Sequence, residues 1–179
     1  MAPPLAKIQL DKFIQAINKV ELSKIRIEAD EVTYNQHIII RFEIEKDLFA
    51  EKISVNELPQ VWNQKYSDYL GVKVQDDSEG VMQDTHWASG LYGYFPSYAI
   101  GNIYSGQITA AINKQLPEWR KYVALGKLDR VNGWLKTNIH RRGNLYDPEE
   151  LIEKATGIGL DSEPYLKYLN EKYGDLYSF

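Results

Sequence analysis

The sequence predicts a mostly α-helical protein. Apolar residues recur at helical spacing along most of the chain, and proline and glycine stand where these patterns begin and end. Residues 25–52 contain neither glycine nor proline, and an uninterrupted run of that length is typical of a helix. We therefore expect a multi-helix fold with at most one short β-hairpin near residues 72–77.

Seven segments carry the helical pattern. In chain order they are residues 8–17, 25–52, 58–70, 98–116, 127–142, 148–156 and 163–173. The second segment is ambiguous when read alone, because apolar residues alternate from Ile38 to Ile44 as they would in a strand. Its length favours a helix, and so do the early carboxylates Glu28, Asp30 and Glu31, because acidic residues stabilise a helix N-terminus.

Capping residues define the ends of the other helices. Ser54 or Asn56 is expected to cap the third helix, and Gly71 ends it. The fourth ends before Pro117. Asp147 is followed by a proline and two glutamates, a clear signal for a helix start, and a glycine follows each of the last three helices.

The composition suits a single globular domain over residues 1–179. The chain is 44% hydrophobic and 26% charged, which is enough apolar material for one core. Its net charge is -4 and its basic residues are scattered, so we expect no nucleic-acid partner. No apolar run is long enough to span a membrane. The chain has no cysteine, which excludes disulfides and thiolate metal sites and fits a cytoplasmic location.

No local motif supplies a metal site or a nucleophile. A zinc-binding helix places two histidines four residues apart, whereas His37, His86 and His140 each stand alone. Glycine-rich phosphate loops and the G-x-S-x-G motif of serine hydrolases are also absent. The sequence therefore predicts no metal ligands in this chain, and its candidates are residues for binding and transition-state stabilisation.

Two long motifs occupy residues 25–45 and 80–107. The first contains I-R-x-x-A-D as Ile25, Arg26, Ala29 and Asp30. The second contains G-x-x-Q-D-x-H-W as Gly80, Gln83, Asp84, His86 and Trp87. Both motifs and the tail from residue 138 closely resemble the carboxypeptidase Taq family of zinc metallocarboxypeptidases.

The resemblance implies the C-terminal half of a helical zinc-metallopeptidase fold. In that family the H-E-x-x-H zinc helix and the glutamate that completes the site precede the I-R-x-x-A-D element, and this chain contains neither. The resemblance thus implies a zinc or cobalt cofactor held by an N-terminal zinc-binding portion, and a peptide substrate with a free C-terminus. A half-enzyme would expose apolar surface, so we expect a homo- or hetero-oligomer, such as a dimer.

The same resemblance suggests roles for single residues. The stretch "YFPSYAIGNI" is more distantly similar to angiotensin-converting enzyme and the thimet oligopeptidases, which implies that Tyr94 donates to the developing oxyanion and that His86 contacts the substrate. Arg26 would bind the C-terminal carboxylate with its planar fork of N–H donors. The further candidates are Tyr98, Gln83 and Tyr92 for substrate binding, and Asp84, Asp30 and Trp87 for support of the site.

Structural roles compete with these assignments. The tyrosines could be core rings whose hydroxyls find local partners, and His86 could be a buried, hydrogen-bonded ring. Arg26 could pair with a nearby carboxylate on a helix surface. Arg41 and Glu45 are four residues apart, and we expect a solvated ion pair between them.

Three functional hypotheses follow from the sequence. The chain could be a working part of a zinc carboxypeptidase that joins an N-terminal partner and removes C-terminal residues from peptides. It could instead be a non-catalytic module for peptide binding or assembly that kept the peptidase fold. It could also be a fragment of a full-length enzyme without an independent role.

Overall fold

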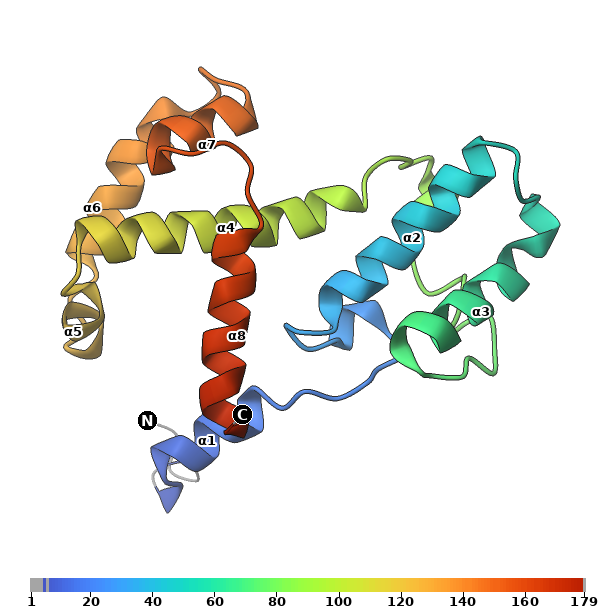
Figure 1. Ribbon diagram of the computed structural model, residues 1–179, viewed down its shortest axis with the longest axis horizontal. Coiled ribbons are helices and arrows are strands. Elements are labelled where there is room, and N and C mark those ends of the chain that lie inside the picture. The colour runs from blue at the N-terminus through green and yellow to red at the C-terminus, as the bar shows by residue number, and fades with distance from the viewer. Residues whose placement is uncertain (1–4, 6, 179) are drawn as a thin grey trace. The chain divides into compact units, whose positions relative to one another are not determined.

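The computed structural model of the protein describes residues 5 and 7–178 (Figure 1). It contains two compact units, Met1–Ala99 and Ile100–Phe179, and each has its own hydrophobic core. The α-helices are α1 (Leu10–Ile17), α2 (Tyr34–Phe49), α3 (Leu58–Leu70), α4 (Pro96–Gln115), α5 (Trp119–Ala124), α6 (Asp129–Asn138), α7 (Pro148–Thr156) and α8 (Glu163–Tyr177). The short 3₁₀ helices are η2 (Arg26–Glu28), η3 (Val55–Glu57), η4 (Trp87–Ser89) and η5 (His140–Arg142). The prediction of a single domain over residues 1–179 stays a prediction.

The mostly α fold class is confirmed. The described residues contain no strand, and residues 72–77 form a loop instead of a hairpin. No helix among them is long and apolar enough to cross a membrane. α7 has the predicted bounds, while α8 continues past Gly174 to Tyr177 and the short α5 was not predicted.

The predicted helix over residues 25–52 is wrong at its start. The carboxylate of Asp30 accepts hydrogen bonds from the backbone N–H groups of Val32 and Thr33 and from the Thr33 hydroxyl. These bonds hold the chain in a turn, so α2 begins only at Tyr34. Carboxylates that suggested a first helical turn therefore lie before the helix, where aspartate competes with helix formation.

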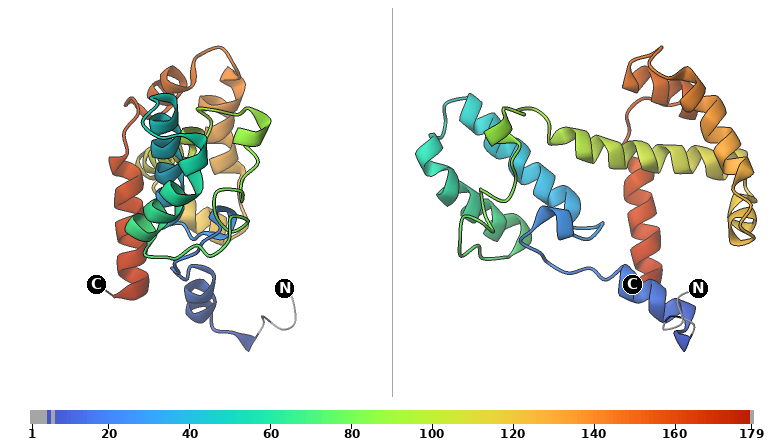
Figure 2. Two further views of the ribbon diagram at one scale, coloured as in Figure 1. Left: turned by 90° about the vertical axis from the view of Figure 1, so that its right-hand side faces the viewer. Right: turned by 180° about the vertical axis from the view of Figure 1, so that it is seen from behind.

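The core of the first unit lies between α2 and α3, which pack against each other (Figures 1 and 2). Ile40 and Ile44 of α2 meet Trp62, Tyr66 and Leu70 of α3, and each set repeats every four residues along its helix. The rings of Trp62 and Tyr66 stack with centroids 5.0 Å apart. The loop after α3 crosses this pair, because Trp87 also packs against the core.

The core of the second unit joins α4, α6 and α7 through Ala111, Ile112, Trp134 and Ala155. α8 approaches α4 so closely that a Cβ atom on Gly106 would lie 2.6 Å from the Cα of Tyr165, so only glycine fits there. None of the predicted site residues lies in this unit.

Candidate functional site

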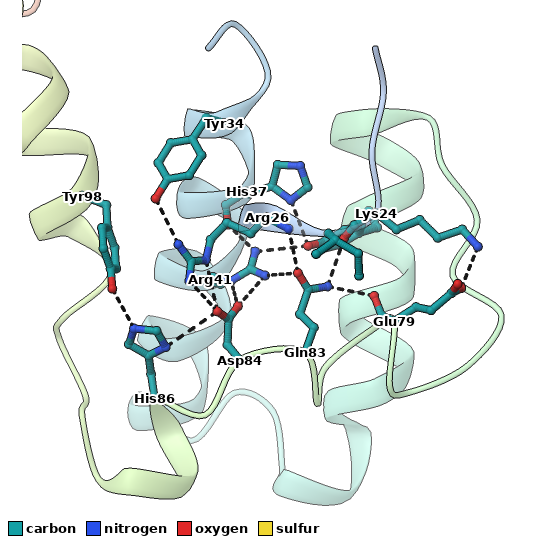
Figure 3. A network of polar contacts seen from close by, with 12 residues as sticks. Lys24, Arg26, Tyr34, His37, Arg41, Glu79, Gln83, Asp84, His86 and Tyr98 are labelled. Carbon is teal, nitrogen blue, oxygen red and sulfur yellow. Dashed lines mark hydrogen bonds and ion pairs between the residues drawn. The ribbon is translucent and has the colours of Figure 1, made fainter. Parts of the chain in front are cut away.

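Asp84 lies at the centre of a buried charge network in the first unit (Figure 3). One carboxylate oxygen accepts hydrogen bonds from Arg26, at 3.1 Å from Nε and 2.6 Å from Nη2. The other accepts from Nε of Arg41 at 2.7 Å. Two guanidinium groups from segments far apart in the sequence thus share one carboxylate.

Gln83 completes this network. Its side-chain oxygen accepts from the backbone N–H of Arg26 and from Nη2 of Arg41, both at 2.9 Å. Its amide nitrogen donates to the backbone oxygens of Lys24 and Glu79. Every polar atom of the Gln83 side chain is therefore bonded within the protein, and its predicted contact with substrate stays a prediction.

The predicted solvated ion pair between Arg41 and Glu45 is wrong. Arg41 is 0% exposed, and besides Asp84 and Gln83 it donates to the backbone oxygen of His37 and to the hydroxyl of Tyr66. Glu45 is also buried and binds a different segment. The loop of residues 83–93 separates the two side chains from solvent, which the spacing of four residues could not reveal.

The network keeps its charges at neutral pH. Burial alone would raise the pKa of Asp84, but the hydrogen bonds from Arg26 and the charge of Arg41 outweigh it and hold that pKa below its usual value. Burial opposes the charge of Arg26, yet Asp84 and Tyr34 raise its pKa. The centre is thus a carboxylate between two guanidinium ions.

Arg26 has spare donors beside an aromatic ring. It is 6% exposed, and it donates hydrogen bonds to Asp84 and to the hydroxyl of Tyr34, which lies 3.0 Å from Nη1. Its guanidinium carbon lies 4.9 Å from the ring centroid of Tyr98. An arginine has five N–H donors, so among the described residues each terminal nitrogen keeps one hydrogen without a partner.

His86 lies between the charge network and the tyrosines. Its Nε2 is 3.0 Å from the hydroxyl of Tyr98 in the first turn of α4, and its Nδ1 is 3.7 Å from Asp84 (Figure 3). Its ring centroid is 5.6 Å from that of Tyr94. The structure therefore brings Arg26, His86, Tyr94 and Tyr98 together, all of which the sequence analysis named.

The two remaining tyrosines differ in their surroundings. Tyr94 is 44% exposed, its ring packs against His86 and Tyr98, and its hydroxyl has no hydrogen bond to another described residue. Tyr92 packs edge-on against Phe49 at the end of α2. Tyr94 is thus the phenol that has a free donor beside the histidine.

The comparisons with known proteins identify the family of the chain. The family model of the carboxypeptidase Taq (M32) metallopeptidases matches residues 1–173. The chain belongs to the carboxypeptidase Taq (M32) family. Its M32 relatives include carboxypeptidase 1 of Bacillus subtilis, 46% identical over 95% of the chain, and thermostable carboxypeptidase 1 of Thermus thermophilus, 43% identical over 97%.

A solved M32 structure has the same fold. The M32 carboxypeptidase of Deinococcus radiodurans R1 superposes with a TM-score of 0.94 at 42% identity, over 98% of this chain and 35% of that one. The chain covers 34% of the length of each of the two relatives named above. It therefore spans about a third of the M32 proteins it matches.

The M32 family implies a metal ion, and the residues described here do not form a site for one. Among residues 5 and 7–178, no group of three or more histidine, cysteine, aspartate or glutamate side chains is placed to hold a metal. Asp84 and His86 are close, but both oxygens of Asp84 are taken by arginines.

Asp30 and Trp87 bind segments away from the rings of His86 and Tyr94, and their predicted support of the site stays a prediction. Asp30 accepts the backbone N–H of Glu21 as well as the bonds that start α2, and so fixes the segment that leads to Arg26. The indole of Trp87 donates to Glu45 at 3.0 Å. Sequence reasoning missed the buried positions of Arg41 and Glu45, which lie four and eight residues after the buried His37 and so share its face of α2.

The buried His37 makes stability depend on pH. Burial and the charge of Arg41 lower its pKa from 6.5 to about 4. Between these values the unfolded chain binds a proton that the folded chain does not, so stability is lost as pH falls from 6.5 toward 4. We expect a loss of up to about 3 kcal/mol, measured by urea unfolding at several pH values.

Two variants test the origin of this pH dependence. His37→Gln should remove most of the slope between pH 6.5 and 4, because the titrating ring is gone. His140→Gln, at an exposed histidine of the second unit, should leave the slope unchanged. An unaltered slope in His37→Gln would contradict the assignment.

Proposed function

We propose that this chain provides the substrate-binding wall of a metallocarboxypeptidase, which removes C-terminal amino acids from peptides. The observation that carries the proposal is the convergence of Arg26, His86, Tyr94 and Tyr98 in the first unit of an M32 family member. In this proposal the metal, zinc or cobalt, is held by an N-terminal portion of the enzyme. Association with that portion or with a second copy, and a cytoplasmic location, are further parts of it.

Arg26 is the group proposed to recognise the free C-terminus. Its two spare N–H donors lie on different terminal nitrogens, the pair of nitrogens through which a guanidinium binds a carboxylate end-on. Asp84 and Tyr34 hold the guanidinium in place, and the ring of Tyr98 packs against its face. The second arginine on Asp84 leaves a net positive charge in the network, which attracts an anionic chain end.

Tyr94 and His86 are proposed to act at the scissile peptide bond. A phenol stays protonated at neutral pH, so Tyr94 can donate a hydrogen bond to the carbonyl oxygen as negative charge develops there. His86 is held by Tyr98 and points its ring at the same region, where it can contact the substrate backbone. The bound metal would activate water and polarise the carbonyl.

An assay with matched substrates tests the proposal. A blocked dipeptide with a free C-terminus and the same dipeptide with an amidated C-terminus would be incubated with the chain, Zn²⁺ or Co²⁺, and the metal-binding portion. We expect hydrolysis of the free form, little of the amidated form, and none when the metal-binding portion is left out. Hydrolysis by the chain alone, or equal cleavage of both substrates, would refute the proposal.

A further inference from the structure

Glu45 binds both ends of the segment of residues 87–93, which lies between the two proposed catalytic residues His86 and Tyr94. It is 7% exposed on α2, and one of its carboxylate oxygens accepts the indole N–H of Trp87. The other oxygen accepts the backbone N–H of Gly93. His86 directly precedes the first of these donors, and Tyr94 directly follows the second.

We propose that Glu45 is a positioning residue that sets the separation of His86 and Tyr94. The inference rests on the proposed function, because those two side chains matter for catalysis only if that function holds. The hydrogen bonds of Glu45 go to Trp87 and Gly93 and not to the two rings, so it acts on His86 and Tyr94 through the chain between them.

The segment of residues 87–93 is a compact turn, so the two bonds to the Glu45 carboxylate are enough to fix its position. Residues 87–89 form η4, and Gly90 then reverses the chain with a left-handed φ of 72°. Gly93 also has a left-handed φ, 69°, a conformation that favours glycine. The backbone N–H of Leu91 donates to His86, so the segment is a compact turn, and the bond to Gly93 fixes its exit.

Helix α2 thus fixes the 83–94 segment at two points one helical turn apart. Arg41 binds Asp84 and Gln83 at the start of the segment, and Glu45 binds its later part. Both side chains are buried, so neither bond is weakened by competing water. The two charged side chains on this face of α2 therefore determine where the segment lies on the helix.

Amide hydrogen exchange of the full 179-residue chain tests the anchor directly. A glutamine amide offers one acceptor oxygen where a carboxylate offers two, so Glu45→Gln can keep only one of the two bonds. In Glu45→Gln we expect the exchange rate to rise about tenfold at one of the two groups, the Gly93 amide or the Trp87 indole. In Glu45→Ala it should rise at both. Unchanged exchange at both groups in Glu45→Gln would overturn the proposal.

Glu43→Gln is the matched control. Glu43 lies on the same helix and binds Lys65 and Tyr69 of α3, so its loss weakens the α2–α3 pair without touching the loop. Exchange at Gly93 and Trp87 should stay as in the wild type. If exchange at these two groups rose as much as in Glu45→Gln, any weakening of the α2–α3 contact would loosen the segment. That result would overturn the specific role of Glu45.

Kinetics of the assembled enzyme test the effect on Tyr94. Glu45→Gln should lower kcat about 10- to 100-fold with a smaller change in KM, because a displaced donor is felt mainly in the transition state. In a Tyr94→Phe background it should cause little further loss. An equal loss in both backgrounds would overturn positioning through Tyr94. If Tyr94→Phe alone has no effect, the proposed function fails at that residue, while hydrogen exchange still decides the anchor.

Discussion

Replacing Tyr94 by phenylalanine should lower kcat of the assembled carboxypeptidase about 100- to 1000-fold, with little change in KM. The substitution removes the donor that we propose for the developing oxyanion, and losses of this size are typical for such donors. Because the Tyr94 hydroxyl has no partner among the described residues and the side chain is 44% exposed, the folded structure should hardly change. Steady-state kinetics on a blocked dipeptide measure the effect.

Two further phenylalanine variants make the assignment specific. Tyr69→Phe removes an exposed phenol from α3 that bonds to Glu43, and it should leave kcat near the wild-type value. Tyr98→Phe removes the hydroxyl that holds His86, so we expect a smaller loss than for Tyr94→Phe. A larger loss for Tyr98→Phe would move the donor role to Tyr98, and full activity of Tyr94→Phe would remove the role from Tyr94.

Replacing Asp84 by asparagine should lower the free energy of unfolding by about 3–5 kcal/mol. The side chains of Arg26 and Arg41 are 7% and 0% exposed, so the neutral amide would leave two buried guanidinium ions without a counter-charge. The loss should appear as a lower midpoint in urea at pH 7 with an unchanged slope.

Glu79→Gln is the control for Asp84→Asn. Glu79 lies in the same loop and pairs with Lys24 at 2.7 Å, but both side chains are partly exposed. Pairs of that kind contribute about 0–1 kcal/mol. If the two variants lost the same free energy of unfolding, burial could not be the reason why the Asp84 network stabilises the fold.

Much of the fold could be predicted because local signals define single helices. Asp147 and Pro148 begin α7 and Gly157 ends it, as predicted, since capping depends on neighbouring residues alone. The start of α2 was wrong because Asp30 bonds to the backbone of Val32 and Thr33, and the sequence does not tell whether a carboxylate lies in a first turn or before it. Helix boundaries were therefore predictable where neighbouring residues mark them, as in α7, and not at the start of α2.

The site could be predicted only in part for a different reason. Arg26, His86, Tyr94 and Tyr98 came from motif resemblance, which identifies residues without their contacts. Arg41 and Glu45 looked like a surface pair because their partners lie about 40 residues further along the chain. The spacing of Arg41 and Glu45 from His37 puts all three on one face of α2. Whether that face is buried depends on where the loop after α3 folds, which no local pattern encodes.

The bonds between residues 24–26 and residues 83–84 connect positions 57 to 59 apart in the chain, whereas α2 and α3 are consecutive. Closing so long a loop costs more chain entropy than bringing two consecutive helices together. The α2–α3 hairpin can therefore form early, and the Arg26 segment joins it late in folding. A variant that weakens the bonds between Asp84 and Arg26, such as Asp84→Asn, should then raise the unfolding rate much more than it lowers the refolding rate. The segment proposed to bind the C-terminal carboxylate of the peptide would be the last part of this unit to fold and the first to unfold.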